Sequence, residues 1–318
     1  MDESNPHLSI VIPLFNAALT LPDLYRELSA LEIVGGFELV LVNDGSRDET
    51  ETIALKLTRE SRIPITFLSL SRNFGEHNAV LAGLRVSTGQ YVVTMDDDLQ
   101  NPPSEVLKLL ATAKSEQRDV VYAIYERKEH AWWRNLGSRL TNLIADYVVE
   151  KPRKLYLSSF RCMTRLIADE VARSRNPYPY IDGLIFQITQ NAGVVRVRHV
   201  EREQGRSGYT LRKLVRLWTS MLVNFSVLPL RLMTVAGMIT SALGFLALIE
   251  VVLEHMLKRN PTGWGSLMAA ILLLSGTQLL LLGIMGEYVG RIHLGISEKP
   301  QSVVRATSRS TGKAGINP

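Results

Sequence analysis

The chain has 318 residues, of which 46% are hydrophobic and 21% are charged, and it carries a formal net charge of +5. A chain of this length holds enough apolar material for one large domain or two smaller ones. The single cysteine, Cys162, excludes an internal disulfide framework and fits a reducing compartment.

The N-terminal part of the chain alternates short apolar runs with helical patterns. Strands are expected at Leu8–Asn16, over a run that starts at Phe37 and closes on Asp44, and at Ile65–Leu70, Tyr91–Met95 and Val120–Ile124. Helices are expected at Leu21–Leu31, Asn78–Val86 and Val106–Lys114, with Ser46 or Asp48 placed to cap a further helix. This alternation predicts an α/β fold with an open, mostly parallel sheet and helices on both faces.

Polar residues stand where these strands end. They are Asn16 after the first strand, Asn43, Asp44, Gly45 and Ser46 after the second, Arg72 and Asn73 after the third, and Asp96, Asp97 and Asp98 after the fourth. The carboxyl ends of parallel strands share one edge of the sheet, where ligands bind in such folds. The first strand lacks the glycine-rich turn of redox dinucleotide sites, and no phosphate-binding P-loop is present. The pattern therefore predicts a nucleotide site of another kind.

Three consecutive carboxylates, Asp96–Asp98, are the strongest chemical signal in the chain. Like charges this close repel one another unless a cation lies between them, and carboxylates suit Mg²⁺ or Mn²⁺ shared with substrate phosphates. On an extended backbone, Asp96 and Asp98 would lie on one side and Asp97 on the other. The alternative is a solvated acidic turn that caps the helix expected after Asn101.

Two apolar runs, Leu232–Leu253 and Leu267–Met285, have about the length of a membrane span. We expect two transmembrane helices, with a buried soluble hairpin as the alternative. Basic residues precede the first run and follow the second, which favours a cytoplasmic catalytic domain and cytoplasmic termini. Because these basic residues lie beside the apolar runs, they indicate lipid and not nucleic acid as the partner.

The expected organisation has four parts. Residues 1–209 form the catalytic domain, 210–231 a juxtamembrane amphipathic segment, 232–289 a transmembrane hairpin, and 290–318 a cytoplasmic, largely disordered tail.

Four motifs, in this order, carry a family resemblance: SIVIPLFN, VNDGSRDET, SRNFGEHNAVLAG and TMDDDLQNPP. Together with EREQGRSGY and GEYVGRIH, they resemble family 2 glycosyltransferases of the GT-A fold. Within that family the chain resembles the polyprenyl-phosphate glycosyltransferases, which include dolichol-phosphate mannose synthases, bactoprenol glucosyltransferases and undecaprenyl-phosphate aminoarabinose transferases.

The resemblance implies roles for individual residues. Residues expected to bind the nucleotide sugar are Pro13, Phe15, Asn16, Asp44, Gly45, Ser46, Arg72, Asp96, Asp97 and Gln100, with Asp96 and Asp98 also meeting the metal, Mg²⁺ or Mn²⁺. Arg127, Arg134 and Ser138 are expected at the acceptor phosphate, and Arg202 in a mobile loop that closes on the donor. The expected catalytic residues are Asp98, Asp182, Arg134 and Arg202.

The chain departs from the family pattern in two places. Leu155 stands where members commonly carry an aspartate, before the turn Ser158-Ser159-Phe160-Arg161, and Gly208 stands where a lysine is usual. Asp182 is the candidate replacement carboxylate. These changes put acceptor handling and sugar choice in question.

The leading hypothesis is an inverting, metal-dependent transferase that moves a sugar from a nucleotide donor onto a polyprenyl (undecaprenyl) phosphate at the cytoplasmic face of a bacterial inner membrane, for cell-envelope glycan. Its partners would be the nucleotide sugar, the polyprenyl phosphate, membrane lipid and further copies of itself, in a dimer or tetramer. Two alternatives remain. One is transfer to a lipid-linked saccharide or another hydroxyl acceptor, which needs a base. The other is a non-catalytic nucleotide-sugar-binding subunit.

Overall fold

The structure, a computed structural model, describes residues 6–125, 157–175, 179–198, 234–240, 242–246, 249, 253, 263–296 and 300–310. The chain divides into two compact units. The first combines Met1–Gly208 with Lys299–Pro318, and the second is Tyr209–Glu298.

The predicted alternation of strands and helices in the N-terminal part is confirmed, with small shifts of the boundaries. The strands are β1 (Leu8–Leu14), β2 (Phe37–Asn43), β3 (Ile65–Leu70), β4 (Tyr91–Thr94), β5 (Val120–Tyr125), β6 (Arg161–Thr164), β7 (Ala192–Val197) and β8 (Val304–Ser310). The helices are α1 (Leu21–Ser29), α2 (Thr50–Glu60), α3 (Glu76–Leu84), the 3-10 turn η1 (Pro103–Glu105), α4 (Val106–Ser115), α6 (Arg165–Ala172), α7 (Ile181–Ile188) and α10 (Trp264–Ile296).

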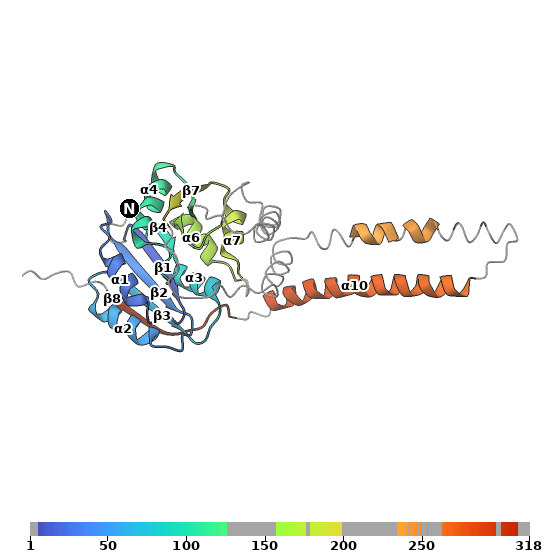
Figure 1. The fold of residues 1–318 in the computed structure, drawn as a ribbon, viewed down its shortest axis with the longest axis horizontal. Helices are drawn as coiled ribbons and strands as arrows, with labels where there is room; N and C mark the ends of the chain where they lie inside the picture. Colours follow the sequence, from blue (N-terminus) through green and yellow to red (C-terminus); the bar gives the residue numbers. More distant parts are fainter. Residues whose placement is uncertain are drawn as a thin grey trace, which may run out of the picture. The chain divides into compact units, whose positions relative to one another are not determined.

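One eight-stranded sheet, in the order β7-β5-β6-β4-β1-β2-β3-β8, forms the centre of the first unit (Figure 1). The pairs β1–β2, β1–β4, β2–β3 and β5–β7 are parallel. Strand β6 runs antiparallel to both β4 and β5, and β8 runs antiparallel to β3. The expected α/β fold with a mostly parallel sheet is confirmed, and the ends of β1 to β4 meet at one edge of it.

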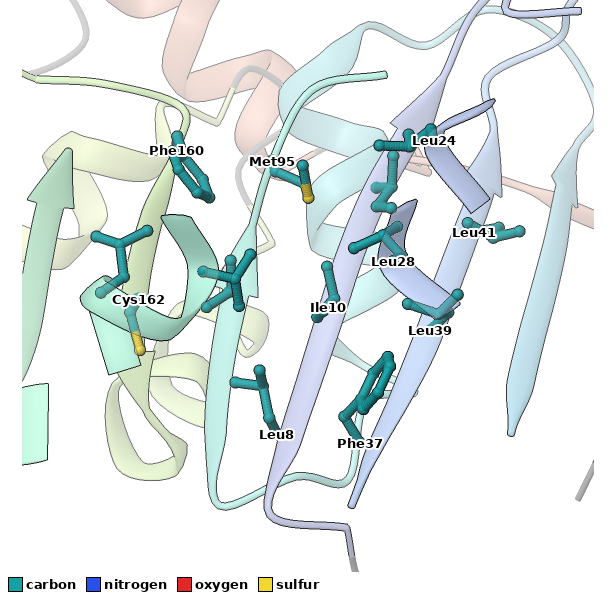
Figure 2. Close-up of a cluster of buried hydrophobic side chains, with 14 of the residues drawn as sticks. Leu8, Ile10, Leu24, Leu28, Phe37, Leu39, Leu41, Met95, Phe160 and Cys162 are labelled. Atoms are coloured by element: carbon teal, nitrogen blue, oxygen red, sulfur yellow. The ribbon is translucent and has the colours of Figure 1, made fainter. Parts of the chain in front are cut away.

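One face of the sheet carries the main hydrophobic cluster. Ile10 of β1 and Leu39 of β2 belong to this cluster together with Leu24 and Leu28 of α1 (Figure 2). Residues of α2 and α4 complete it. Because fully burying one leucine side chain stabilises a fold by roughly 1.5–3 kcal/mol, this cluster fixes the sheet that carries the strand ends.

Helix α3 covers the opposite face, where Val11 points because side chains alternate along a strand. A Cβ atom at Gly83 would lie 2.4 Å from a methyl carbon of Val11 and 3.1 Å from one of Val42, so only glycine allows this approach. The seven residues from Asn78 to Leu84 are all buried. This tight packing brings the N-terminus of α3, with Glu76, to the carboxyl edge of the sheet.

The prediction of a disordered tail is wrong for residues 304–310. They form β8, which extends the sheet by pairing with β3 from Ile65↔Ser310 to Leu70↔Val304. Gln301 is buried and accepts a hydrogen bond from Arg85. The tail therefore returns to the first unit and is part of its sheet, while residues 311–318 lie outside the described residues.

The second unit contains the two apolar runs. Residues 234–240 and 242–246 are helical, and α10 extends beyond both ends of the predicted run Leu267–Met285 and beyond the expected hairpin boundary at residue 289. Among the residues that are described, none of the helices combines the length and the apolar character that crossing a membrane requires.

Candidate functional site

The acidic triplet follows β4 at the carboxyl edge of the sheet. Because β4 ends at Thr94, Asp96–Asp98 lie in a turn and not on an extended strand, so the expected two-sided alternation does not apply. Each of the three carboxylates is partly exposed and is held by its own hydrogen bond.

These hydrogen bonds tie the triplet to both neighbouring strands. Asp97 Oδ2 accepts a bond of 3.0 Å from the backbone N–H of Phe15, just after β1. Asp96 Oδ2 accepts one of 2.6 Å from the hydroxyl of Ser159, just before β6. Since β4 lies between β1 and β6, the triplet is held across three strands. Within the turn, Asp98 Oδ1 accepts a bond of 3.1 Å from the N–H of Gln100.

Negative charge accumulates at this turn. Burial, and after it the charges of Asp96 and Asp98, raise the pKa of Asp97 to about 6 against the opposing effect of the Phe15 N–H. Perturbation of this kind, by burial together with like charges, is typical of functional sites.

Glu76, at the start of α3, is a member of the site that the sequence analysis missed. Its side chain reaches the surface, yet partial removal of water by the surrounding protein and, next, the negative charge of Asp96 together raise its pKa to about 7. The motif that contains Glu76 was recognised, but its spacing along the chain does not reveal the electrostatic effect of Asp96 and Asp97 on it. The site therefore carries one more carboxyl group than expected.

The triplet fits a metal ion that is shared with a ligand. Among the described residues, no group of three or more His, Cys, Asp or Glu side chains is arranged to hold a metal ion. Asp96 and Asp98 offer hard carboxylate oxygens, which Mg²⁺ and Mn²⁺ prefer. With so few protein ligands, such an ion would need phosphate oxygens and water to complete its coordination.

The loops after β1 and β2 are joined at the same edge. The N–H of Asn16 donates to Ser46 Oγ over 3.0 Å, and the N–H of Arg47 donates to Asn16 Oδ1 over 3.0 Å. Asn16 adopts a φ of 55°, a conformation that asparagine tolerates better than most residues. The structure thus brings the predicted residues Asn16 and Ser46 together.

Asp44 is buried, with 3% of its surface exposed, and it holds the loop after β3. Its two oxygens accept bonds of 2.7 Å from the N–H of Phe74 and 2.9 Å from that of Gly75. Burial raises its pKa, and these two bonds oppose the shift. The observed role of Asp44 is therefore to hold two loops together, and its contact with a nucleotide stays a prediction.

Gly45 allows the same two loops to touch. It has a φ of 68°, and a Cβ atom there would lie 2.5 Å from the backbone of Arg72. The Arg72 side chain is exposed, with its guanidinium carbon 4.4 Å from the centre of the Phe74 ring. Pro13 lies near the end of β1, in register with Val42 of β2.

Asp182 belongs to a buried ion pair and not to the open edge. Its Oδ1 accepts hydrogen bonds from Arg161 and, over 2.9 Å, from the hydroxyl of Tyr122. Arg161 is 2% exposed and Asp182 is 6% exposed. Burial lowers the pKa of Arg161, but the charge of Asp182 outweighs this and raises it. Asp182 is therefore engaged as a counter-ion, in place of the free carboxylate that we expected.

Several predicted residues lie outside the described part of the chain. They are Arg127, Arg134 and Ser138 of the expected acceptor site, Arg202 of the expected donor loop, and the departures at Leu155 and Gly208. Their roles stay predictions.

Comparison with known proteins finds similarity along nearly the whole chain. Residues 9–170 match the family described as glycosyl transferase family 2, and residues 228–292 match the GtrB C-terminal hairpin. A protein of Enterobacter sp. (strain 638), named undecaprenyl-phosphate 4-deoxy-4-formamido-L-arabinose transferase, is 34% identical over 315 residues, covering 96% of both chains. A protein of the same name from Pseudomonas aeruginosa (strain LESB58) is 33% identical, covering 96% of this chain and 92% of its own.

Solved structures show the same fold. Glucosyl-3-phosphoglycerate synthase from Mycobacterium tuberculosis, in complex with Mn²⁺, UDP and glucosyl-3-phosphoglycerate, matches with a TM-score of 0.51. The match covers 70% of this chain and 79% of that one at 17% sequence identity, so it supports the fold alone.

Proposed function

The chain belongs to glycosyl transferase family 2, and from this premise we propose that it transfers a sugar from a nucleotide-sugar donor onto a polyprenyl phosphate for cell-envelope glycan. The observation that carries the proposal is the triplet Asp96–Asp98, tied to the end of β1 through Phe15 at the edge where the loops after β1, β2 and β3 are joined to one another. The two relatives named as undecaprenyl-phosphate sugar transferases support the choice of acceptor.

In the proposed donor complex, the nucleotide occupies the loops after β1 to β3. Phe15, which is 48% exposed, offers an aromatic surface beside the polar groups of Asn16 and Ser46. Arg72 is exposed on the neighbouring loop and offers a positive charge to phosphate. The sugar would face the triplet and Glu76.

We propose that Asp96 and Asp98 would hold the Mg²⁺ or Mn²⁺ that accompanies the donor diphosphate. The hydroxyl of Ser159 fixes the orientation of Asp96, and the N–H of Gln100 that of Asp98. When bound, such a metal ion neutralises negative charge on the departing nucleoside diphosphate.

The acceptor oxygen belongs to a phosphate that is already anionic near neutral pH, so no strong base is needed to activate it. Attack on the face opposite the leaving nucleotide would invert the anomeric centre, which NMR of the product would establish. The predicted residues Arg134 and Ser138 would hold the acceptor phosphate, with Arg127 nearby, and Arg202 would close on the donor. The remaining electrostatic problem is to bring a phosphate close to a diphosphate, and arginine side chains reduce that repulsion.

The ion pair of Asp182 with Arg161 is evidence against a hydroxyl acceptor. Transfer to a hydroxyl group requires a base, and the candidate base is already paired with Arg161 and bonded to Tyr122. A phosphate acceptor removes this requirement, so we favour the polyprenyl phosphate.

We further propose that residues 232–289 form two membrane spans at the bacterial inner membrane, with the catalytic unit and both termini cytoplasmic. The two apolar runs and the match of residues 228–292 to a C-terminal hairpin family support this topology. Labelling of single cysteines introduced at residue 260 and in the C-terminal tail, from either side of sealed vesicles, would test it. Both sites labelling from the same side would exclude two spans.

The function is tested with purified full-length protein, undecaprenyl phosphate, Mg²⁺ or Mn²⁺, and a panel of UDP-, GDP- and dTDP-sugars, with mass spectrometry of the lipid products. We expect glycolipid from one donor, and its loss with EDTA and in Asp98→Ala. Metal-dependent binding of nucleotide without any glycolipid would overturn the acceptor assignment.

A further inference from the structure

The C-terminal strand β8 is connected to the candidate donor site by a continuous series of hydrogen bonds. Arg305 of β8 donates from Nη2 to both oxygens of Glu51 in α2, over 2.7 and 2.5 Å. The same nitrogen lies 3.1 Å from the hydroxyl of Ser69, at the end of β3. Glu51 is 254 positions away from Arg305 in the sequence, so only the pairing of β8 with β3 brings the two together.

Glu51 also contacts Asn43, the last residue of β2. Asn43 Nδ2 donates to Glu51 Oε2 over 3.3 Å, and Asn43 Oδ1 accepts from the N–H of Ser46 over 3.0 Å. Asn43 is 1% exposed, so water cannot substitute for either partner. An amide rotated by 180° would place its oxygen against the carboxylate and its NH₂ group against an N–H, and both contacts would be repulsive. The negative charge of Glu51 therefore sets the orientation of the Asn43 amide.

Ser46 completes the series. Its hydroxyl accepts the N–H of Asn16, whose side-chain oxygen in turn accepts the N–H of Arg47. Asn16 follows Phe15, which donates its own N–H to Asp97. Hydrogen bonds thus connect Arg305 through Glu51, Asn43 and Ser46 to the loop after β1.

We propose that Arg305 is a positioning residue for the donor nucleotide. Its charge compensates that of Glu51, which lets Glu51 keep the Asn43 amide in the orientation that the Ser46 and Asn16 loops require. This inference rests on the proposed function, because it assigns those loops to the nucleotide. It also gives β8 a role in donor binding in addition to its place in the sheet.

The test compares Arg305→Ala with Arg309→Ala in the full-length protein. Arg309 lies on the same strand, is exposed, and forms no ion pair within the described part of the chain, so its variant removes one positive charge without touching Glu51. Binding of UDP, GDP and dTDP with Mn²⁺ is measured by calorimetry, and KM and kcat with the active donor. We expect Arg305→Ala to weaken nucleotide binding and raise the donor KM by about three- to fivefold, the size of one ion pair in a network, with kcat unchanged within about twofold.

A double-mutant cycle distinguishes an effect through the hydrogen bonds of Glu51 from a general destabilisation of the fold. Glu51→Ala should weaken binding more than Arg305→Ala, because it also leaves Asn43 Nδ2 without its acceptor. The double variant should bind no worse than Glu51→Ala alone. Fully additive losses, or an Arg305→Ala protein that binds like Arg309→Ala, would overturn the inference while the proposed function stands. A wild-type protein that binds none of the nucleotides would overturn both.

Discussion

Two carboxylate sites in the first unit, Asp182 and the triplet Asp96–Asp98, differ in how their charge is compensated. Asp182 is buried against Arg161, and the hydroxyl of Tyr122 supplies a further hydrogen bond. Asp97 and Asp98 lie beside Asp96 at the edge of the sheet, and within the described residues neither forms an ion pair. Asp182 has its own cation in Arg161, whereas Asp97 and Asp98 have none among the residues that the structure describes.

The difference in charge compensation indicates different roles for the two sites. A buried carboxylate with a built-in arginine holds the fold together, because removing either partner leaves an uncompensated charge. Carboxylates whose pKa is raised by burial and by each other, as for Asp97, cost the free protein stability. That cost is expected where a ligand supplies the missing positive charge. Four changes test the comparison, in order of decreasing expected effect.

Asp182→Ala should lower the free energy of unfolding by about 3–5 kcal/mol, because Arg161 would remain charged and buried without a partner. Urea denaturation measures the effect. The double variant Asp182→Asn with Arg161→Met keeps an acceptor for Tyr122 and removes both charges, so it should lose clearly less. Equal losses in the two proteins would mean that the ion pair is not what holds this region.

Asp98→Asn should lower the rate of glycolipid formation by about 10²–10³-fold, the loss typical of removing one electrostatic contact to a developing charge. Its melting temperature should equal or exceed that of the wild type, since it removes a like charge from the triplet. A rate within tenfold of the wild type would remove Asp98 from the metal site. A large fall in melting temperature would place it with the structural carboxylates.

Ser159→Ala should weaken Mn²⁺ binding by about tenfold, because partners that orient a ligating carboxylate typically contribute 10- to 100-fold to metal affinity. The hydroxyl that it removes donates to Asp96 over 2.6 Å. Electron paramagnetic resonance of Mn²⁺ in the presence of the bound nucleotide gives the affinity directly. Ser158→Ala is the matched control, since that hydroxyl contacts Tyr125 and the N–H of Phe160. The same affinity in both variants would contradict the role of Ser159.

Asp97→Asn should stabilise the metal-free protein by about 1 kcal/mol at pH 8, after allowance for partial exposure and screening. The pKa of Asp97 is about 6 in the folded protein against an ordinary 3.8, so the folded state binds more protons between these values. The contribution of Asp97 to the free energy of unfolding of the wild type therefore falls as the pH rises from about 4 to 6. The asparagine variant avoids this loss because it cannot ionise. Thermal unfolding in EDTA at pH 4 and pH 8 measures it. A gain of equal size at both pH values would exclude a charge effect.

Much of the half of the sheet that contains β1 to β4 could be predicted from the sequence. The strands β1 to β4 are short apolar runs that end in polar residues, and parallel pairing brings such ends to one edge. The positions of Asn16, Ser46 and Asp96–Asp98 follow from this local pattern alone, since each residue lies in the loop just beyond the end of a strand.

The antiparallel insertion of β6 between β4 and β5 could not be predicted in this way. It places Ser159 against Asp96 and Arg161 against Asp182, pairs that are 63 and 21 positions apart. Its position in the sequence suggested that Asp182 is a free carboxylate. Only its neighbours in space show that it is the counter-ion of Arg161.

The tail illustrates the same limit. The sequence of β8, Val-Arg-Ala-Thr-Ser-Arg-Ser, has no apolar alternation, and its composition indicated disorder. As the edge strand of the sheet it is mostly exposed, so its order comes from backbone hydrogen bonds to β3 and from the contact of Arg305 with Glu51.

The sequence by itself determined the strand pattern, the acidic turn after β4 and the family to which the chain belongs, because each depends on residues close together along the chain. Only the tertiary structure decided which charges are compensated. The pairing of Asp182 with Arg161, the support of Asp96 by Ser159 and the link from Arg305 to Asn43 join segments far apart in sequence. The energy of a charged group depends on its neighbours in space, and the order of residues alone does not fix them.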